Sequence, residues 1–263
     1  MNKLIILGSS NAIPSLGYEN THLALITPRQ KVLIDCGANP VVSLQQAGVD
    51  INEITDIILT HMHPDHVGGL PLLLMDMWLS GRKTSLNLHG LPYTLQRIKS
   101  MMDIYEWSHW PNFFPVKFCT FPAQELAIVL NDEQLCVYSS PVNHFLPNVC
   151  LRFELKEEKI SFAYSCDTEP CQAVWNLAQG VDILLHEAAG AITGHSSATQ
   201  AGEVARRAGV NQLYLIHYPT GQFASGDLIS EARSRFSGEI NLAVDQMIID
   251  LSDNRNPREY PQK

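Results

Sequence analysis

The fold is decided by residues 57–66, which read Ile57-Ile58-Leu59-Thr60-His61-Met62-His63-Pro64-Asp65-His66. A short apolar run, which predicts a buried strand, leads directly into four groups that can bind a metal ion. Side chains alternate faces in an extended chain, so His61 and His63 point the same way. Pro64 then ends the strand and starts a helix that carries Asp65 and His66. Two imidazoles can therefore bind one metal ion while the carboxylate and the third imidazole reach a second.

A single histidine at such a position would be interpreted as a hydrogen-bonded core or surface residue. Three histidines and an aspartate in the pattern HxHxDH do not fit that interpretation. Burying four titratable groups at the end of a strand is costly unless a cation offsets their desolvation. The sequence therefore predicts a metal site at this position.

Composition limits the class of protein around this site. The chain has 263 residues, of which 45% are hydrophobic and 17% charged, so it can bury a large core and is not disordered by composition. Lys and Arg number 18 against 27 Asp and Glu, and the resulting charge of -9 repels polyanions at long range. A general nucleic-acid coat is not expected on this ground, whereas bound metal ions can reverse the sign of the charge locally.

The expected location is the cytoplasm. The apolar segment at residues 4–8 is too short for a signal peptide, and no apolar run approaches the ~18 residues that span a bilayer, so no membrane partner is expected. Six cysteines occur without a CxxC pair, which argues against a disulfide framework.

Short apolar runs separated by Gly, Pro, Asn and Asp recur throughout and predict strands. They lie at about residues 3–7, 22–27, 31–35, 55–60, 85–89, 115–120, 134–140, 149–155, 160–165, 181–185, 212–216, 240–243 and 247–251. Helices are predicted after Pro40, ending at Gly48, and from Thr168 and Pro170 to near Gly180. Ser197 and Gln200 form a capping-box pattern that predicts a helix over 198–208. No linker divides the chain, so we predict one domain at 1–252 and a polar tail at 253–263.

Three further candidate ligands occupy equivalent places. His144 follows the run 135–142, Asp167 follows 160–165, and His217 follows 213–216. Loops at the carboxyl ends of strands are the usual place for a site, so these side chains are expected to meet.

Taken in order, these motifs resemble the metallo-β-lactamase superfamily, and most of all its ribonuclease Z-like branch. Supporting matches are Leu7-Gly8-Ser9-Ser10 with Pro14-Ser15, Leu33-Ile34-Asp35-Cys36-Gly37, Ser165-Cys166-Asp167-Thr168, Leu185-His186-Glu187-Ala188 and His195-Ser196-Ser197. The resemblance implies an α+β fold, a four-layered αβ/βα sandwich in which two mixed sheets pack face to face with helices outside. It also implies a site where the two halves meet at one edge.

The resemblance implies two sets of metal ligands. His61, His63 and His144 would hold one metal, Asp65, His66 and His217 the other, and Asp167 would bridge them. Ligands that are all imidazole and carboxylate favour two Zn(II) ions, with Mn(II) or Fe(II) as alternatives. Cys166 neighbours a ligand, but strand alternation is expected to turn its side chain to the other face.

Two residues are assigned catalytic roles. Asp65 could accept a proton from a water shared by the metals, which leaves the hydroxide, as well as bind metal. By resemblance, His195 would stabilise the transition state and protonate the departing oxygen. Its position just before a helix N-terminus also favours an anionic group there.

Three further residues are candidates for supporting the ligands. Asp35 could fix a ligand imidazole, although an aspartate that only forms a turn before Gly37 is an equally good interpretation. His186 and Glu187 have a supporting role by resemblance, against the alternative of a plain buried hydrogen-bonded pair. The remaining histidines, His22, His89 and His109, match no motif and are assigned no role.

The substrate is inferred from what the chain lacks. Ribonuclease Z carries a long arm that grips tRNA between the segments corresponding to His144 and Asp167, whereas here only 23 residues separate these positions. That interval fits two strands joined by residues 156–159, so RNA is not the favoured substrate. We expect a dinuclear-metal-dependent hydrolase that acts on a small or cyclic phosphodiester through a metal-bridging hydroxide.

Other functions stay open as alternatives. They are tRNA 3′-end processing by a ribonuclease Z and hydrolysis of lactones, thioesters or sulfate esters. A diiron oxidoreductase is disfavoured because His63 stands where a carboxylate would be expected. A non-catalytic metal-binding module is disfavoured because all seven candidate ligands are present.

The stretch 101–115 is rich in aromatic residues around His109. We interpret it as a hydrophobic flap or an oligomer contact in preference to a substrate lid, which makes a homodimer an expectation.

Overall fold

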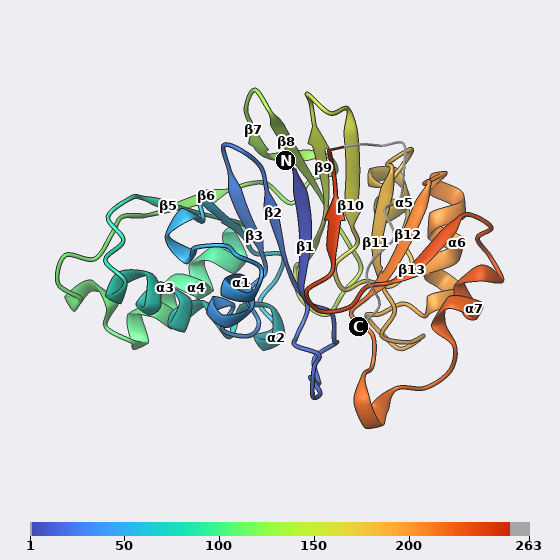
Figure 1. Cartoon of the computed structure of the whole chain (residues 1–263), viewed down its shortest axis with the longest axis horizontal. Coiled ribbons are helices and arrows are strands. Elements are labelled where there is room, and N and C mark those ends of the chain that lie inside the picture. The colour runs from blue at the N-terminus through green and yellow to red at the C-terminus, as the bar shows by residue number, and fades with distance from the viewer. Residues whose placement is uncertain (1, 253–263) are drawn as a thin grey trace.

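The computed structural model describes residues 2–252, and the predicted tail at 253–263 lies outside the described residues (Figure 1). The burial pattern of β1 (Lys3–Gly8) explains why the protein folds in layers. Leu4 and Ile6 enter one buried cluster, whereas Ile5 and Leu7 enter another. A strand that is apolar on both faces has to be covered on both, here by a second sheet on one side and by helices on the other.

The first sheet contains seven strands in the order β14-β1-β2-β3-β4-β5-β6. Their bounds are β14 (Ile248–Asp250), β1, β2 (His22–Ile26), β3 (Lys31–Ile34), β4 (Asp56–Ile58), β5 (Leu86–Gly90) and β6 (Val116–Thr120). β14 pairs antiparallel with β1, with Leu4 opposite Ile249, so a segment from the far end of the sequence completes this sheet. Its outer face is covered by α1 (Val41–Gln46), α3 (Leu70–Leu79) and α4 (Pro92–Ile104).

The second sheet also contains seven strands, in the order β13-β12-β11-β10-β9-β8-β7. Their bounds are β13 (Glu239–Leu242), β12 (Gln212–Ile216), β11 (Ile183–Glu187), β10 (Ile160–Tyr164), β9 (Val149–Leu155), β8 (Leu135–Pro141) and β7 (Ala127–Asn131). Its outer face packs against α5 (Gln172–Leu177), α6 (Ala198–Ala208) and α7 (Leu228–Arg233). Both sheets are mixed, because each contains parallel and antiparallel pairs. The predicted α+β sandwich of four αβ/βα layers is confirmed.

The local predictions mostly hold. The capping box of α6 is formed, with Gln200 N donating to Ser197 Oγ and Ser197 N donating to Gln200 Oε1. The prediction for 55–60 is too long, because β4 ends at Ile58. The amide of Thr60 is bound by the Asp35 carboxylate instead of by a neighbouring strand, which is why the strand ends there. β7, α3, α4 and α7 were not predicted.

The aromatic stretch 101–115 belongs to the first half of the molecule. Trp110 stacks on Trp78 of α3 with ring centroids 5.1 Å apart, and Trp78 Nε1 donates to the Pro111 carbonyl. Phe114 is buried in the cluster between the first sheet and its helices. The stretch, which includes the short helix η2 (Trp107–His109), therefore acts at least in part as packing over α3.

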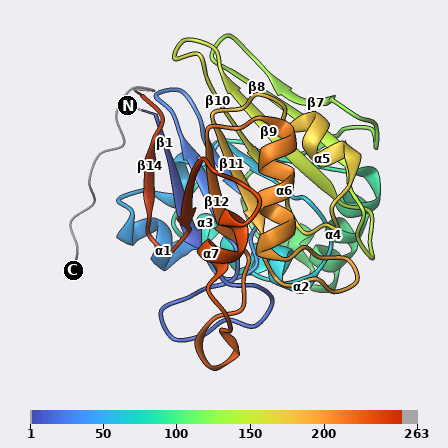
Figure 2. The same cartoon turned by 90° about the vertical axis from the view of Figure 1, so that its right-hand side faces the viewer.

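The carboxyl ends of several strands gather at one edge of the sandwich. β1, β3 and β4 run in one direction in the first sheet, and β8, β10, β11 and β12 do so in the second. The loops 9–21 and 218–227, which follow β1 and β12, project side by side from this lower edge in Figures 1 and 2. They are joined by a hydrogen bond from Asn11 N to the Tyr218 carbonyl. Within residues 2–252, no helix has the length and apolar character needed to cross a membrane.

Candidate metal centre

Three histidines from distant segments converge at this edge. His61 and His63 follow β4, and His144 follows β8. The Nδ1 atom of His63 lies 3.0 Å from His61 Nε2 and 3.0 Å from His144 Nε2. Together with a carboxylate oxygen of Asp167, these nitrogens lie within 4.8 Å of one another. This set is the first ligand cluster.

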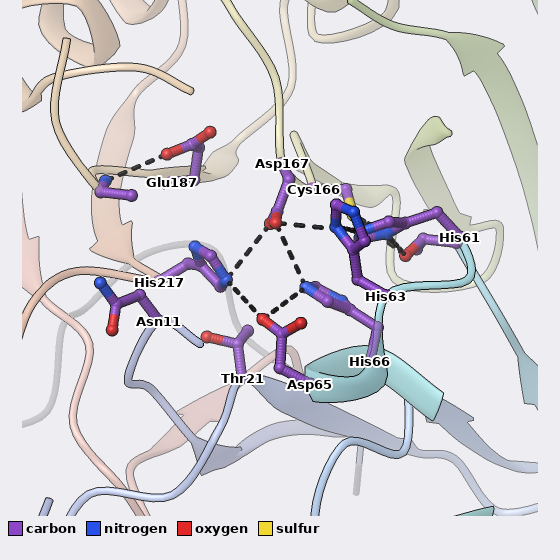
Figure 3. A network of polar contacts seen from close by, with 12 residues as sticks. Asn11, Thr21, His61, His63, Asp65, His66, Cys166, Asp167, Glu187 and His217 are labelled. Atoms are coloured by element: carbon purple, nitrogen blue, oxygen red, sulfur yellow. Dashed lines mark hydrogen bonds and ion pairs between the residues drawn. The ribbon is translucent and has the colours of Figure 1, made fainter. Parts of the chain in front are cut away.

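The second ligand cluster consists of Asp65, His66, Asp167 and His217, whose ligand atoms also lie within 4.8 Å of one another (Figure 3). The Nε2 atom of His66 is 3.4 Å from Asp167 Oδ2, and that of His217 is 3.4 Å from Asp167 Oδ1. Asp65 Oδ2 lies 3.6 Å and 3.5 Å from the same two nitrogens. Asp167 belongs to both clusters.

For two of the imidazoles, the partner of the outer nitrogen shows which nitrogen is free to bind metal. His144 Nδ1 lies 2.8 Å from the Gly194 carbonyl, and His66 Nδ1 lies 2.8 Å from Asp35 Oδ2. Both partners are acceptors, so Nδ1 carries the hydrogen and Nε2 presents its lone pair to the cluster. Among residues 2–252, His66 Nε2 and Asp167 Oδ1 are buried atoms with no hydrogen-bond partner. Lone pairs that face one another in a buried place fit a bound cation.

The directions in which the pKa values of the buried ligand candidates are shifted also fit a bound cation. Burial lowers the pKa of His66, but the carboxylates of Asp167 and Asp35 outweigh it and raise that pKa well above its usual value. Burial raises the pKa of Asp167, yet His217 and His66 hold it well below the usual range. Burial and the neighbouring His66 lower the pKa of His61 well below normal, so its ring is neutral and available as a ligand. The residues present therefore fit divalent cations.

Three residues that follow strands at the site adopt left-handed backbone conformations. They are Asp35, Cys166 and His217, with φ of 60°, 52° and 52°. Such values are unusual outside glycine, and strained positions of this kind cluster at functional sites. Here they break the alternation of the strand and direct each side chain toward the centre.

The expectation for Cys166 is wrong for this reason. Its side chain does not turn to the far face, because Sγ lies 3.0 Å from Thr60 Oγ1 and 3.7 Å from His61 Nδ1. The thiol therefore packs behind a ligand ring. Burial raises its pKa well above the usual value, which keeps it neutral.

Thr60 connects the two clusters. Its Oγ1 donates to Asp35, at 2.9 Å from Oδ2, and lies 3.1 Å from His61 Nδ1. With the Cys166 thiol, the single donor and both acceptor positions of this hydroxyl are used. Asp35 also accepts from His66 Nδ1, so one carboxylate orients His66 directly and His61 through Thr60. The structure thus places Asp35 against the ligands, as one of its two sequence-based interpretations expects.

His195 lies beside both clusters. Its ring is parallel to that of His217 at 5.8 Å and edge-on to that of His144 at 5.2 Å. Its Nδ1 is 3.0 Å from Glu187 Oε1, which leaves Nε2 for a substrate. Burial lowers the pKa of His195, but the Glu187 carboxylate outweighs this and raises it above the usual value. Burial in turn raises the pKa of Glu187, against the effect of its hydrogen bond to His195.

Glu187 also fixes the surrounding backbone. Oε1 accepts from Thr168 N at 2.8 Å, and Oε2 accepts from Ala189 N at 3.0 Å. His186, its neighbour on β11, has its Nδ1 2.8 Å from the Glu187 carbonyl, and burial lowers its pKa to about 4. His186 therefore lies outside the contacts that orient the two clusters, which agrees with the plain buried alternative for this residue.

Sequence reasoning missed Thr60 and Glu169. Thr60 was quoted only as part of the strand, although a polar residue directly before the first ligand was a usable signal. Glu169 accepts from Gly194 N at 2.8 Å, across 25 residues of sequence, and nothing in its local pattern indicates that contact.

Comparisons with known proteins agree with this geometry. A family model described as "Anti-Pycsar protein Apyc1" matches residues 2–230. A protein named Ribonuclease Z from Methanothermobacter thermautotrophicus is 27% identical over 307 aligned residues, covering 95% of this chain and 97% of that protein. The metallo-β-lactamase fold protein YhfI from Bacillus subtilis matches with a TM-score of 0.78 at 20% identity, over 94% of this chain and 98% of the other. Human tRNase Z, short form, matches with a TM-score of 0.77 at 21% identity, over 95% and 99%.

Proposed function

Because the chain belongs to the Anti-Pycsar protein Apyc1 family, in the ribonuclease Z-like branch of the metallo-β-lactamase superfamily, and is a metal-dependent hydrolase, we propose that it hydrolyses phosphodiesters. The observation that carries the proposal is the place of His195. This histidine is held by a buried carboxylate beside two clusters of metal ligands. A group that can donate a proton there suits a reaction in which an alkoxide leaves.

We propose that the site holds two divalent cations, with Zn(II) first and Mn(II) or Fe(II) as alternatives. His61, His63 and His144 would hold one, Asp65, His66 and His217 the other, and Asp167 would contact both. When bound, two such cations lower the pKa of a shared water and stabilise negative charge on phosphate oxygens.

The chain's own residues supply the proton transfers. The Asp65 carboxylate is partly exposed, with 12% of its side chain accessible, so it can accept a proton from the attacking water. The raised pKa of His195 keeps its imidazolium populated at higher pH. Nδ1 stays on Glu187 while Nε2 donates its proton to the departing oxygen.

Two substrate classes have support. The curated relatives are named Ribonuclease Z, and they favour tRNA 3′-end processing over the small or cyclic phosphodiester preferred from the sequence. The small substrate is favoured by a different observation, since β9 and β10 are joined by only residues 156–159 and form no tRNA-gripping arm there. The charge of -9 points the same way.

The deciding experiment compares turnover of five substrates by the metal-loaded protein. They are bis(p-nitrophenyl) phosphate, a 2′,3′-cyclic nucleotide, a precursor tRNA with a 3′ trailer, a lactone and a β-lactam. We expect turnover of at least one phosphodiester and its loss in His61→Ala. Turnover restricted to the lactone and the β-lactam would overturn the proposal. Turnover of precursor tRNA alone would assign the RNA substrate.

A further inference from the structure

Gly194 directly precedes His195, and both its backbone N–H and its carbonyl are hydrogen-bonded. Its N–H donates to Glu169 Oε1 at 2.8 Å, and its carbonyl accepts from His144 Nδ1 at 2.8 Å. One residue therefore connects an acidic side chain to a metal-ligand candidate and lies next to the proton donor.

The close approach at Gly194 is specific. Its φ is +79°, and a Cβ built there would lie 2.7 Å from Phe145 Cε2 and 3.1 Å from His144 Nδ1. Only glycine adopts this conformation without strain and also allows the His144 ring so near. A small displacement of this backbone would therefore change the position of the ring.

Glu169 is itself fixed to the segment that carries His144. Its backbone N–H donates to the Asn143 carbonyl at 3.0 Å, and the two residues form an isolated bridge. It also follows Asp167 by two positions. The segments of Asp167, His144 and His195 therefore meet at one residue that lies outside both ligand clusters.

The other contacts of the loop close its ends, tie it to itself, as His195 N does by donating to the Ile192 carbonyl at 3.0 Å, or hold the His195 ring, as Glu187 does. Gly190 N donates to the Ser196 carbonyl at 2.9 Å, and Ser196 Oγ donates to the Thr168 carbonyl at 2.6 Å. These bonds close the ends of the loop 190–196, whereas Ile192 in its middle is 62% exposed. The Glu169 bond fastens the part of the loop next to His195.

We infer that Glu169 is a positioning residue, whose carboxylate holds Gly194 and through it sets the His144 ring and the place of His195. This inference rests on the proposed function, in which His144 binds metal and His195 donates a proton. A hydrogen bond to an ionised carboxylate is about twice as strong as a neutral one. Glutamine offers the same oxygen without the charge, so Glu169→Gln should rescue part of what Glu169→Ala loses.

The first test is hydrogen exchange at the Gly194 amide in the full chain, with and without added zinc. We expect exchange in Glu169→Ala to be at least ~10-fold faster than in the unaltered protein, because the amide loses its acceptor. Glu169→Gln should show an intermediate rate. Unchanged exchange in Glu169→Ala would overturn the inference, whether or not the protein hydrolyses phosphodiesters.

The second test separates positioning from general stability. In Glu169→Ala we expect a zinc Kd about 10-fold higher for one of two sites, the range seen when partners of ligand histidines are lost. We also expect kcat to fall at least ~10-fold with KM nearly unchanged, and partial recovery in Glu169→Gln.

The control is Glu158→Ala, which removes the same charge from the turn between β9 and β10 and should change neither quantity. Equal losses in both variants would overturn the inference. If the unaltered protein cleaves no phosphodiester, the proposed function fails, but zinc affinity and amide exchange still decide the role of Glu169.

Discussion

The buried carboxylate of Glu187 lies 3.0 Å from Nδ1 of His195. This pair links a carboxylate inside the fold to the residue that we propose as the proton donor. The carboxylate has three hydrogen-bond donors, namely the His195 ring and the amides of Thr168 and Ala189. It thus sets the protonation of His195 and the path of the chain around it.

The first prediction concerns pH dependence. The His195 pKa is raised in the folded protein, so the imidazolium persists below that pKa and is lost as pH rises through it. The basic limb of kcat/KM should follow this loss. Glu187→Gln removes the charge that raises the pKa, so the limb should move to lower pH in a rate profile. A limb that stays in place while kcat falls would show that another group titrates there.

The second prediction concerns His195 itself. His195→Ala should retain the full metal content, because the ring lies outside both ligand clusters, yet lose rate by ~10²-fold or more. Elemental analysis and phosphodiester turnover measure the two effects separately. His109→Ala, at a histidine whose side chain is 76% exposed, is the matched control and should change neither. Loss of metal from His195→Ala would mean that His195 is a ligand.

The third prediction concerns Asp35, which orients one imidazole from each cluster. Asp35→Ala should weaken metal affinity by ~10–100-fold, because His66 loses its acceptor and Thr60 loses the partner that directs its hydroxyl. Competition with a chelator measures the change. Asp103→Ala, on the exposed surface of α4, is the control. An unchanged affinity in Asp35→Ala would favour the interpretation of Asp35 as a residue that only forms a turn.

The fourth prediction uses the backbone strain at Cys166. Glycine adopts the left-handed conformation of residue 166 without strain, whereas alanine adopts it with strain. Both substitutions remove the thiol, so they differ mainly in this strain. Cys166→Gly should therefore be more stable than Cys166→Ala by about 1 kcal/mol in its free energy of unfolding, measured with urea. An alanine variant as stable as the glycine variant would show that the conformation carries no strain.

The sequence predicts those parts of the molecule where local pattern and tertiary environment agree. β1 and β12 are apolar at every core position, so each is recognisable as a strand buried on both faces. α3 was missed because Leu70–Leu79 is apolar nearly all round and shows no helical period. β7 was missed because it is a sheet edge with mostly half-buried or exposed residues, so no clear alternation marks it.

The site likewise has features that the local sequence predicts and features that it does not. That the candidate ligands lie close together could be predicted, because the segments that carry them follow strands whose ends meet at one edge. The left-handed turn at Cys166 could not be predicted, because it depends on packing against Thr60 and His61, more than a hundred residues earlier. The contact between Glu169 and Gly194 depends in the same way on the loop 190–196 folding back over the site.

The pairing of β14 with β1 has a consequence for synthesis on the ribosome. Ser9 Oγ donates to Asp245 Oδ1, and Asp245 Oδ2 accepts from Glu19 N, so the segment before β14 also anchors the loop that follows β1. The N-terminal half leaves the exit tunnel first. Until residues 245–250 follow, one edge of β1 has no partner strand. A nascent chain stalled before that point would hold every candidate ligand but present an unpaired strand edge, so resistance to aggregation should depend on the arrival of residues 245–250 and be acquired after the last ligand has been made.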